Sequence, residues 1–411
     1  MAMRLCYNRA CERWSLLHEN PHRRKAIQIT HLSLTNFRNY ERLEFDLPPH
    51  VTVLQGDNAQ GKTNLLEAIY LLATAKSHRA TTERELLKWP VPKEGLEVAR
   101  LLAQVQKGNG TIQVEIALMG AYPRDERAST PPESFEAKLV QKRIKLNGIN
   151  RRAIDLIGQV NVVFFGSQDI DLIAGAPSTR RRYLDLTNSQ VNSRYLRALQ
   201  QYNKVITQRN HLLRLIGEHR AQWDQLDFWD RELLEHGSYI IDARKFMVTE
   251  LEELAQPIHH QLTAGRESLR ITYLPSVGAT EFPDRLQQVR QREVAQGMSV
   301  VGPHRDNLSF IANDVDMNIY GSRGQQRTIA LSLKLAEARF MNSKTDDAPI
   351  LLLDDVLSEL DLTRRQHLLD FVTSQQQVII TTTDLNCFTP AFLTEASLFQ
   401  VKEGTLTPIK E

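Results

Sequence analysis

A glycine-containing loop near residue 60 has the residue types and spacing of a phosphate-binding site. Residues 56–63 read Gly-Asp-Asn-Ala-Gln-Gly-Lys-Thr and satisfy the pattern G-x-x-x-x-G-K-[ST]. In this pattern backbone N–H groups surround the phosphates, the lysine neutralises the outer ones, and the final hydroxyl ligates Mg²⁺. We expect nucleotide contacts from Gly56, Asp57, Asn58, Ala59, Gln60, Gly61, Lys62, Thr63 and Asn64, with Lys62 also catalytic and Thr63 also on the metal.

Two adjacent acids, Asp354 and Asp355, follow the apolar run 350–353. A nucleotide loop needs a carboxylate on a neighbouring strand to hold Mg²⁺, and Asp354 is the candidate ligand. Asp355 lies one residue beyond, where a carboxylate can orient or deprotonate the attacking water. The competing interpretation is a solvated turn.

A serine and two glycines open a further helix before this acidic pair. The segment 321–325 reads Gly-Ser-Arg-Gly-Gln, and the helix that follows is expected to run to about residue 340. A serine among small residues at a helix N-terminus favours anions. The expected nucleotide contacts here are Ser322, Arg323, Gly324 and Gln325. One nucleotide does not need two such loops in one chain, so we expect Ser322 to cap the γ-phosphate held by another copy. The alternative is an ordinary helix cap.

The elements that must position these motifs form an α/β core written in two halves. Apolar residues alternate in 27–34 and recur in 51–54, which predicts strands before the loop, and 64–75 is expected to be a helix. The runs 350–353 and 378–380 are continuously apolar, as in strands buried within a parallel sheet. The second half of the core therefore lies far along the chain.

A helical insertion separates the two halves. Apolar residues recur at spacings of three, four and seven in 199–216 and again in 233–258. These seams predict an antiparallel helical hairpin, an arm on the order of 40 to 50 Å long at ~1.5 Å per residue. The expected boundaries are a disordered N-terminal extension at 1–26, the first part of the head at 27–180, the arm at 181–295 and the second part of the head at 296–411.

Composition restricts the class of protein. The 411 residues are 41% hydrophobic, and no apolar run approaches the ~18 residues of a membrane helix, so no membrane association is expected. Three scattered cysteines form neither a disulfide framework nor a zinc site, which indicates a reducing, cytoplasmic compartment. The basic segment 1–26 is either an arm that touches nucleic acid or an unstructured leader.

Basic residues concentrate where the arm begins, although the net charge is only +2. Between residues 180 and 220 there are two acids and nine Lys or Arg: Arg180, Arg181, Arg182, Arg194, Arg197, Lys204, Arg209, Arg214 and Arg220. Such a stripe binds duplex DNA through its phosphates without reading sequence, and Arg194, Arg197 and Lys204 are the candidate contacts. The alternative is a solvated helix face. His304 and Arg305 line either the nucleotide or DNA surface, or a tight turn.

The order of these motifs resembles a known architecture. The order resembles that of an ABC-type ATPase head of the SMC kind: the phosphate loop, the arm, the serine that opens a helix, the acidic pair and the Ser-Glu-Leu-Asp of 358–361. Four segments resemble the RecF family of bacterial recombination mediators, over essentially residues 27–411: Leu-Thr-Asn-Phe-Arg-Asn-Tyr at 34–40, Lys-Ser-His-Arg at 76–79, Ser-Thr-Arg-Arg-Arg-Tyr-Leu-Asp at 178–185 and Gly-Pro-His-Arg-Asp at 302–306.

The resemblance implies a cytoplasmic, ATP-dependent DNA-binding protein of gap repair and replication-fork maintenance. It implies duplex DNA and single/double-strand junctions as ligands, RecR and RecO as partners, an ATP-dependent homodimer, recombinase loading at single-strand gaps and support of the SOS response. It further implies that Arg38 contacts the nucleotide, that Gln168 lies near the metal, and that Ser358 and Asp361 cross the dimer interface.

Two departures from common ABC transporters bear on turnover. Asp355 stands where they usually carry a glutamate, and Thr383 precedes Asp384 in place of their histidine. A shorter acid and the absence of the switch histidine imply slow hydrolysis, as in a protein that uses ATP to time a bound state and not to drive a motor. Two alternatives come from other classes. The first is the ATPase subunit of a membrane transporter or another ABC-type ATPase that does not act on DNA. The second is a small-molecule phosphotransferase. The helical insertion counts against the transporter, and the motif at Ser322 counts against the phosphotransferase.

Overall fold

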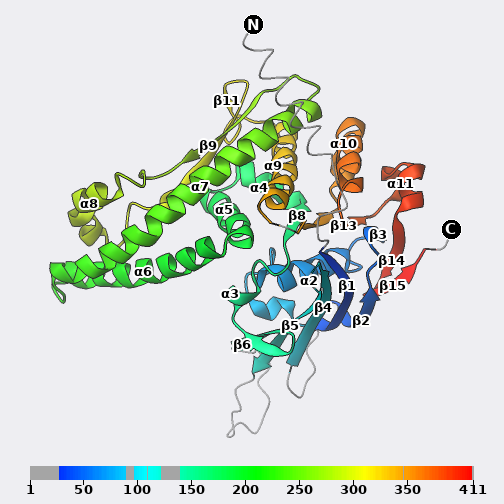
Figure 1. The fold of residues 1–411 in the computed structure, drawn as a ribbon, viewed down its shortest axis with the longest axis horizontal. Coiled ribbons are helices and arrows are strands. Elements are labelled where there is room, and N and C mark those ends of the chain that lie inside the picture. The colour runs from blue at the N-terminus through cyan, green and yellow to red at the C-terminus, as the bar shows by residue number, and fades with distance from the viewer. Residues whose placement is uncertain (1–26, 89–96, 109, 122–138, 346, 410–411) are drawn as a thin grey trace.

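The computed structural model describes residues 27–88, 97–108, 110–121, 139–345 and 347–409 as a head with a projecting arm (Figure 1). The predicted extension at 1–26 lies outside the described residues. Within the described chain, no helix is long and apolar enough to cross a membrane.

The head is built on a sheet that takes strands from three distant parts of the chain. Its order is β15-β14-β3-β13-β12-β8, parallel except for the edge strand β15. The bounds are β3 His50–Gln55, β8 Val162–Gly166, β12 Ile350–Asp354, β13 Gln377–Thr382, β14 Ser397–Lys402 and β15 Thr405–Pro408. Because β3 pairs with β13 and β8 pairs with β12, neither half of the chain can complete this sheet alone.

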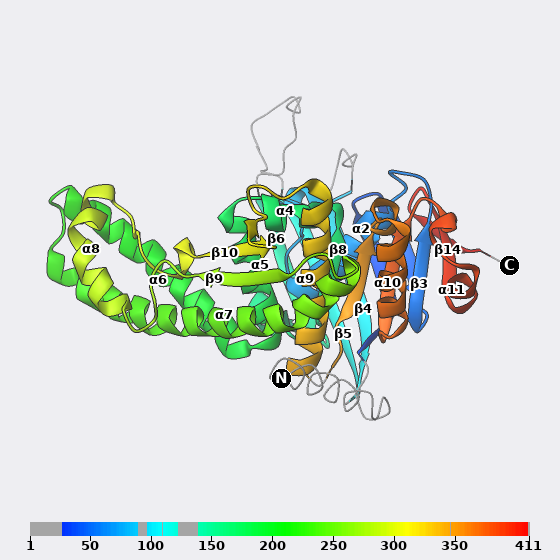
Figure 2. The same ribbon diagram turned by 90° about the horizontal axis from the view of Figure 1, so that it is seen from above.

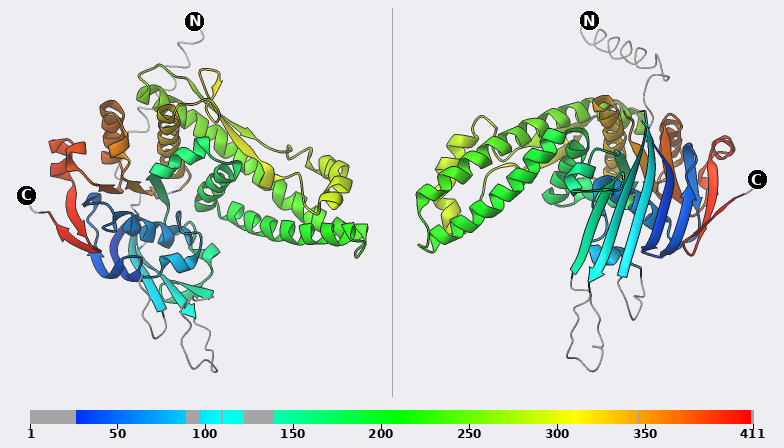
Figure 3. Two further views of the ribbon diagram at one scale, coloured as in Figure 1. Left: turned by 180° about the vertical axis from the view of Figure 1, so that it is seen from behind. Right: turned by 60° about the horizontal axis from the view of Figure 1, so that its bottom comes forward.

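A second, antiparallel sheet covers the other side of the head (Figure 3). Its order is β2-β1-β4-β5-β6-β7, with bounds β1 Gln28–Phe37, β2 Tyr40–Asp46, β4 Glu97–Lys107, β5 Gly110–Ala121, β6 Leu139–Leu146 and β7 Ile149–Arg151. Helix α2, Lys62–Thr74, lies between the two sheets, and only Thr63 and Asn64 among its residues are not buried. A helix that is apolar on every side requires such a position.

The strands of the parallel sheet alternate between two cores. Leu351 and Leu353 of β12 face helices α7 and α9, whereas Ile350 and Leu352 face α2 and the antiparallel sheet. Both faces are covered, which explains why the strand is apolar without interruption. The remaining head helices are α3 Ala153–Leu156, α4 Ile170–Ala174, α9 Arg323–Lys344, α10 Leu362–Thr373 and α11 Pro390–Glu395.

The arm is the expected helical hairpin, joined to the head by a continuous helix (Figure 2). Helix α5, Pro177–Val191, which spans the expected boundary at residue 181, packs in the head core. Helices α6, Ser193–Gly217, and α7, Leu226–Leu262, form the hairpin, and α8, Phe282–Gln296, packs on it. A small sheet, β11-β10-β9, comprises Val315–Asp316, Asn307–Ala312 and Leu269–Leu274.

Helix α7 belongs to both parts of the molecule. Its 37 residues span about 55 Å at ~1.5 Å per residue. Leu233 and Ile240 lie in the arm core, whereas Leu251 and Ile258 lie in the core of the head. One uninterrupted rod therefore runs from the tip of the arm into the head.

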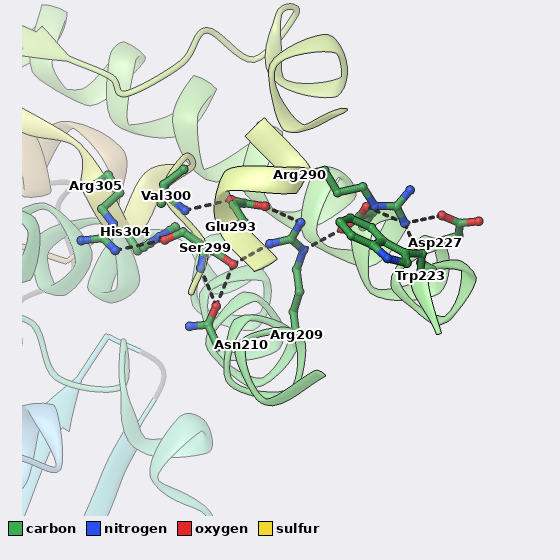
Figure 4. A network of polar contacts seen from close by, with 11 residues as sticks. Arg209, Asn210, Trp223, Asp227, Arg290, Glu293, Ser299, Val300, His304 and Arg305 are labelled. Carbon is green, nitrogen blue, oxygen red and sulfur yellow. Dashed lines mark hydrogen bonds and ion pairs between the residues drawn. The ribbon is translucent and has the colours of Figure 1, made fainter. Parts of the chain in front are cut away.

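Two of the nine residues in the predicted basic stripe, Arg180 and Arg209, are buried and do not belong to its surface. Arg209 is 0% exposed and donates to Asp230 Oδ1 at 2.6 Å and to Glu293 Oε2 and Ser299 Oγ at 2.7 Å (Figure 4). These contacts hold α6 to the segment around α8. Arg209 is thus a structural ion-pair residue of the arm.

Arg180 is likewise taken up inside the protein. Its guanidinium donates to Asn307 Oδ1 at 2.7 Å and to the carbonyl oxygen of Gly175 at 2.8 Å. It joins α5 to β10. By contrast, six of the nine basic residues are exposed, and the candidate DNA contacts among them, Arg194, Arg197 and Lys204, lie on α6.

Replacing Arg209 with Met leaves Glu293, whose side chain is 0% exposed, without its ion-pair partner. Breaking a buried pair on one side costs about 3–5 kcal/mol, so we expect the free energy of unfolding to fall by that amount and the urea midpoint to move to a lower concentration. Arg214→Met, which removes an exposed arginine from the same helix, serves as the control and should change stability by less than about 0.5 kcal/mol. Equal urea midpoints for the two variants would contradict the buried-pair assignment.

Candidate nucleotide-binding site

The phosphate loop leaves β3 and enters α2 in a shape that only glycine permits at two positions. A Cβ on Gly56 would lie 2.4 Å from the carbonyl oxygen of Val401, and Gly61 has φ +112° with its Cβ position 2.5 Å from Asn39 Nδ2. Asn39 Nδ2 donates to Gln60 O at 3.0 Å, and the Tyr40 hydroxyl donates to Gly61 O at 3.0 Å. The antiparallel sheet thus braces the loop.

The N-terminus of α2 has no side-chain cap. The first N–H groups of a helix lack intrahelical acceptors, and with the helix dipole they favour an anion. Lys62 is 7% exposed, and its Nζ donates to Gly56 O at 2.7 Å and Asp57 O at 2.8 Å. Burial lowers the pKa of Lys62, and Asp355, Asp354 and Asp57 act in the opposite direction. An ammonium group and uncapped N–H groups therefore converge on the loop.

Thr63 and Asp354, predicted as metal ligands, are brought into contact although 291 residues separate them. Thr63 Oγ1 donates to Asp354 Oδ1 at 2.8 Å, and Thr381 Oγ1 donates to the same oxygen at 2.8 Å. A hydroxyl and one carboxylate suit Mg²⁺, which takes few protein ligands and completes its shell with water and phosphate oxygens. No cluster of three or more His, Cys, Asp or Glu side chains placed to hold a metal occurs within the described residues.

Asp355 is held in an unusual conformation beside this pair. Its φ is +52°, in the left-handed region, and its backbone N–H donates to Thr381 Oγ1 at 3.0 Å. One carboxylate oxygen, Oδ1, is buried without a hydrogen-bond partner, and burial raises the pKa of Asp355 while Ser358 and Lys62 oppose the rise. Backbone strain and a carboxylate with an open acceptor are features of functional positions.

Arg38 and Gln168 lie near the site in different ways. Arg38, at the β1–β2 turn with φ +54°, donates from Nε and Nη2 to both carboxylate oxygens of Glu67 on α2, each at 2.9 Å. Gln168 is exposed in a short turn after β8, whose Gly166 pairs with Asp354. Gln168 therefore lies at the same sheet edge as the acids, whereas the Arg38 guanidinium is occupied by Glu67.

The segment around Ser322 caps helix α9 at a separate exposed place. Ser322 Oγ accepts from Gln325 N at 3.3 Å, and Gln325 Oε1 accepts from Ser322 N at 3.1 Å. Ser322, Arg323 and Gly324 are exposed. Within the described part of the chain, no hydrogen bond or ion pair joins residues 320–325 to the loop 56–63.

The loop 357–361 is tied to this helix. Arg327 Nε of α9 lies 3.1 Å from Glu359 Oε2, and Asp361 accepts from Arg364 N at 3.0 Å as the N-cap of α10. The hydroxyl of Ser358 donates to Asp355 O at 2.8 Å. The loop predicted to cross the dimer interface thus connects the acidic pair with the helix of Ser322.

Thr381 is a site residue that the sequence did not reveal. Its hydroxyl lies between Asp354 Oδ1 and the N–H of Asp355, because β13 pairs with β12 in the register Asp354 to Thr381. The only signal in the sequence is the threonine run that ends β13. It indicates a contact with Asp354 only once the pairing of β13 with β12 is known.

His304 belongs to a turn at the base of the arm. Its Nε2 lies 3.0 Å from Ser299 O and its Nδ1 lies 2.7 Å from the Tyr202 hydroxyl, so the ring is held as a donor to the carbonyl and an acceptor from the phenol. Burial lowers the pKa of His304 to about 4. The structure shows the turn, His304 also lines the groove between the base of the arm and the antiparallel lobe, and Arg305 is exposed beside it.

A groove of about 790 Å³ separates the base of the arm from the antiparallel lobe. Five cations and two carboxylates line it, an excess of three positive charges: Lys76, Lys142, Arg181, Arg182 and Arg244 against Glu83 and Asp185. Leu196 and Leu199 of α6 form an apolar part of its wall. The groove therefore presents a concave, positively charged surface.

Comparisons with known proteins agree with this geometry. The model of the RecF/RecN/SMC N-terminal domain family matches residues 28–407. The chain is similar to the DNA replication and repair protein RecF of Herpetosiphon aurantiacus, at 45% identity over 392 residues, covering 93% of this chain and 100% of the relative. It is also similar to RecF of Roseiflexus castenholzii, at 42% identity over 400 residues with the same coverage.

Solved structures show the same relationship. The structure of the recombination mediator protein RecF with ATP in the RecFOR pathway superposes with a TM-score of 0.82 at 29% identity, covering 95% of this chain and 100% of the other. The Smc head domain of Pyrococcus furiosus superposes with a TM-score of 0.52 at 14% identity, covering 93% and 96%, which shows the fold alone.

Lys62→Arg keeps the positive charge but replaces a compact ammonium with a wide planar fork that does not fit the space above Gly56 and Asp57. We expect phosphate release to fall at least about tenfold while part of the ATP binding survives, as measured by steady-state hydrolysis and by titration with a fluorescent ATP analogue. Wild-type turnover in this variant would remove the loop from the mechanism.

Proposed function

Because this chain belongs to the RecF family of ABC-type ATPases, which act in DNA replication and repair, we propose that ATP joins two copies of it on DNA and that slow hydrolysis separates them. The single observation that carries the proposal is that, among the described residues, no hydrogen bond or ion pair joins the expected nucleotide contacts at Ser322 to those of the phosphate loop. Lys62, Thr63 and Asp354 converge at one place, while the exposed helix cap at Ser322 lies at another.

Exposed apolar side chains support a second copy as the missing partner. Ile319, Tyr320 and Leu362 are 70%, 74% and 78% exposed, more than any other large hydrophobic residue in the described part of the chain. Two of them precede Ser322 and the third follows Asp361. Apolar area placed beside both predicted interface segments favours association of two such faces.

The roles of this chain's own residues in the proposed reaction follow from their placement. The N–H groups of the loop and Lys62 bind the phosphates, and Thr63 with Asp354 holds Mg²⁺, which supplies charge neutralisation at the transferring phosphoryl group. Asp355 accepts the proton of the attacking water, for which its unpartnered Oδ1 is available. Ser322 and the N–H groups of α9 bind the γ-phosphate of the partner's nucleotide.

The remaining proposed nucleotide contacts are Arg38, Gln168, Arg323, Gly324, Gln325 and the loop residues 57–60. For Arg38, a contact with ATP requires that the guanidinium give up one of its two hydrogen bonds to Glu67. Gln168 needs only to turn at the sheet edge that it already occupies.

DNA is the proposed ligand of the arm. Arg194, Arg197 and Lys204 are exposed on α6, and Arg194 Cζ lies 4.3 Å from the centre of the Tyr239 ring. Among the described residues, none of the three forms an ion pair with a carboxylate. The positively charged groove begins on the same helix. Phosphate contacts of this kind bind duplex and single/double-strand junctions without reading sequence.

In the cell, the proposed dimer acts in the cytoplasm on single-strand gaps. RecR and RecO are the proposed partners, since the similar ATP-bound protein is described as part of the RecFOR pathway. Recombinase loading and support of the SOS response are the proposed outcomes. The transporter and phosphotransferase alternatives have no observation in their favour.

Ser322→Arg tests the shared site, because a bulky cation at a helix N-terminus opposes the dipole and blocks a γ-phosphate. The monomer should still bind ATP through Lys62, but light scattering should show no ATP-dependent dimer. Mixing it with Lys62→Met protein leaves one composite site with both halves intact, so part of the phosphate release should return. Wild-type dimerisation and hydrolysis in Ser322→Arg alone would contradict the proposal.

Removing three exposed cations tests the DNA surface. Arg194, Arg197 and Lys204, all changed to Ala, should weaken duplex binding equally for every sequence and reduce the slope of log affinity against log salt by up to about 3. ATP binding should remain. Arg42→Ala with Lys402→Ala removes exposed charges from β2 and β14 as a control. An unchanged salt slope in the arm variant would leave these residues as a solvated face.

A further inference from the structure

Helix α9, which begins at the signature serine Ser322, is clamped along the arm helix α7. At its far end Lys344 Nζ donates to Glu250 Oε2 at 3.0 Å. Between the ends, Leu251 and Ile258 of α7 share one apolar core with Ile329 of α9. The two helices are therefore held together by both polar contacts and packing.

At the near end, the segment that follows α7 reaches the first turn of α9. Glu267, between α7 and β9, accepts from Gln325 Nε2 through Oε1 at 3.0 Å. Its other oxygen, Oε2, accepts from Nε2 of His259, which is 0% exposed in the last turn of α7. His259 Nδ1 in turn lies 3.1 Å from Ser332 Oγ of α9. One carboxylate thus bridges the end of the arm helix and the start of the signature helix.

The bridge determines how Gln325 faces Ser322. An amide side chain has one accepting atom and one donating nitrogen. Because Glu267 takes the nitrogen of Gln325, its oxygen is directed at the backbone N–H of Ser322, 3.1 Å away. The placement of this N–H and of the serine hydroxyl therefore depends on a residue that belongs to neither the phosphate loop nor the signature segment.

The arm's surface is connected to the same rod. Arg194 of α6 lies over Tyr239 of α7, and Asn192 Nδ2 donates to the Tyr239 hydroxyl at 3.0 Å. A ligand that displaces α6 must therefore act on α7, and α7 carries His259 in its last turn, where His259 contacts Glu267.

We propose that Glu267 is a positioning residue that couples occupancy of the arm to the docking of Ser322 on the partner's nucleotide. The inference rests on the proposed function. By linkage, duplex DNA on the arm strengthens ATP-dependent dimerisation, and the dimer strengthens duplex binding by the same factor. Glu267 touches neither ATP nor DNA; it transmits the one to the other through Gln325.

The test measures a coupling factor, defined as the ratio of the dimerisation constants with and without duplex DNA, in the wild type and in three variants. Dimerisation constants are determined by analytical ultracentrifugation with a slowly hydrolysed ATP analogue, with and without a blunt duplex. For the wild type we expect the duplex to strengthen dimerisation at least about fivefold, within the usual range of allosteric coupling. In Glu267→Ala the factor should fall to about one, while ATP affinity at concentrations below dimerisation stays at the wild-type value.

A second contact between the same two helices separates positioning from general stability. Lys344→Met removes the contact with Glu250 at the far end of α9 and leaves Glu267 and Gln325 in place. We expect this variant to keep the wild-type coupling factor. Glu253→Gln, an exposed acid on α7, is the control and should change nothing.

Two outcomes would overturn the inference: a wild-type coupling factor in Glu267→Ala, or an equal loss of coupling in folded Lys344→Met. If Glu267→Ala fails to fold, Glu267→Gln replaces it, because the amide nitrogen that takes the place of one carboxylate oxygen cannot accept a hydrogen bond from Gln325 or His259. Normal coupling in the Glu267 variants with loss of the dimer in Ser322→Arg would reject this inference alone. Absence of any ATP-dependent dimer in the wild type would reject the proposed function itself.

Discussion

The hydrogen bond from Thr63 to Asp354 is the constraint on which the head depends. It joins the first turn of α2 to the end of β12, so the nucleotide site exists only when two segments 291 residues apart occupy one sheet edge. The interleaved strand order meets this requirement, since β3 pairs with β13 and β8 with β12. The arm is therefore inserted between strands that pair with each other in one sheet. The base of the arm is attached to the same sheet as the nucleotide site, so it cannot move independently of that site.

The polar interior of the arm fits this connection. Arg209 with Glu293, and Arg244 with Asp185 and Asp306, are ion pairs in which the arginine is at most 2% exposed. Buried pairs add little net stability but strongly disfavour arrangements that separate the partners. They hold α6 to α8, and they hold α7 to α5 and to Asp306, which follows the turn 303–305. A rigid base is what a helix needs if it is to carry displacement of the arm toward Ser322.

Local patterns were sufficient for the motifs and for the architecture, but not for the partners of individual side chains. The phosphate loop, the apolar strand before Asp354 and the seams of the arm are short-range signals, and the fold agrees with them. Arg209 was assigned to the surface because nothing near it in sequence predicts Glu293, 84 residues away. Thr381 and Glu267 acquire their roles only through strand register and helix packing, which a single sequence does not specify.

The central claim, that ATP completes its site by bringing in a second copy, is tested most directly by the mass of a protein that binds ATP but cannot hydrolyse it. Asp355→Asn removes the proposed proton acceptor while leaving Lys62, Thr63, Asp354 and Ser322 in place. Light scattering should give a dimer with ATP and Mg²⁺, and a monomer with ADP or without nucleotide. A monomer under all three conditions, or a dimer irrespective of nucleotide, would contradict the account.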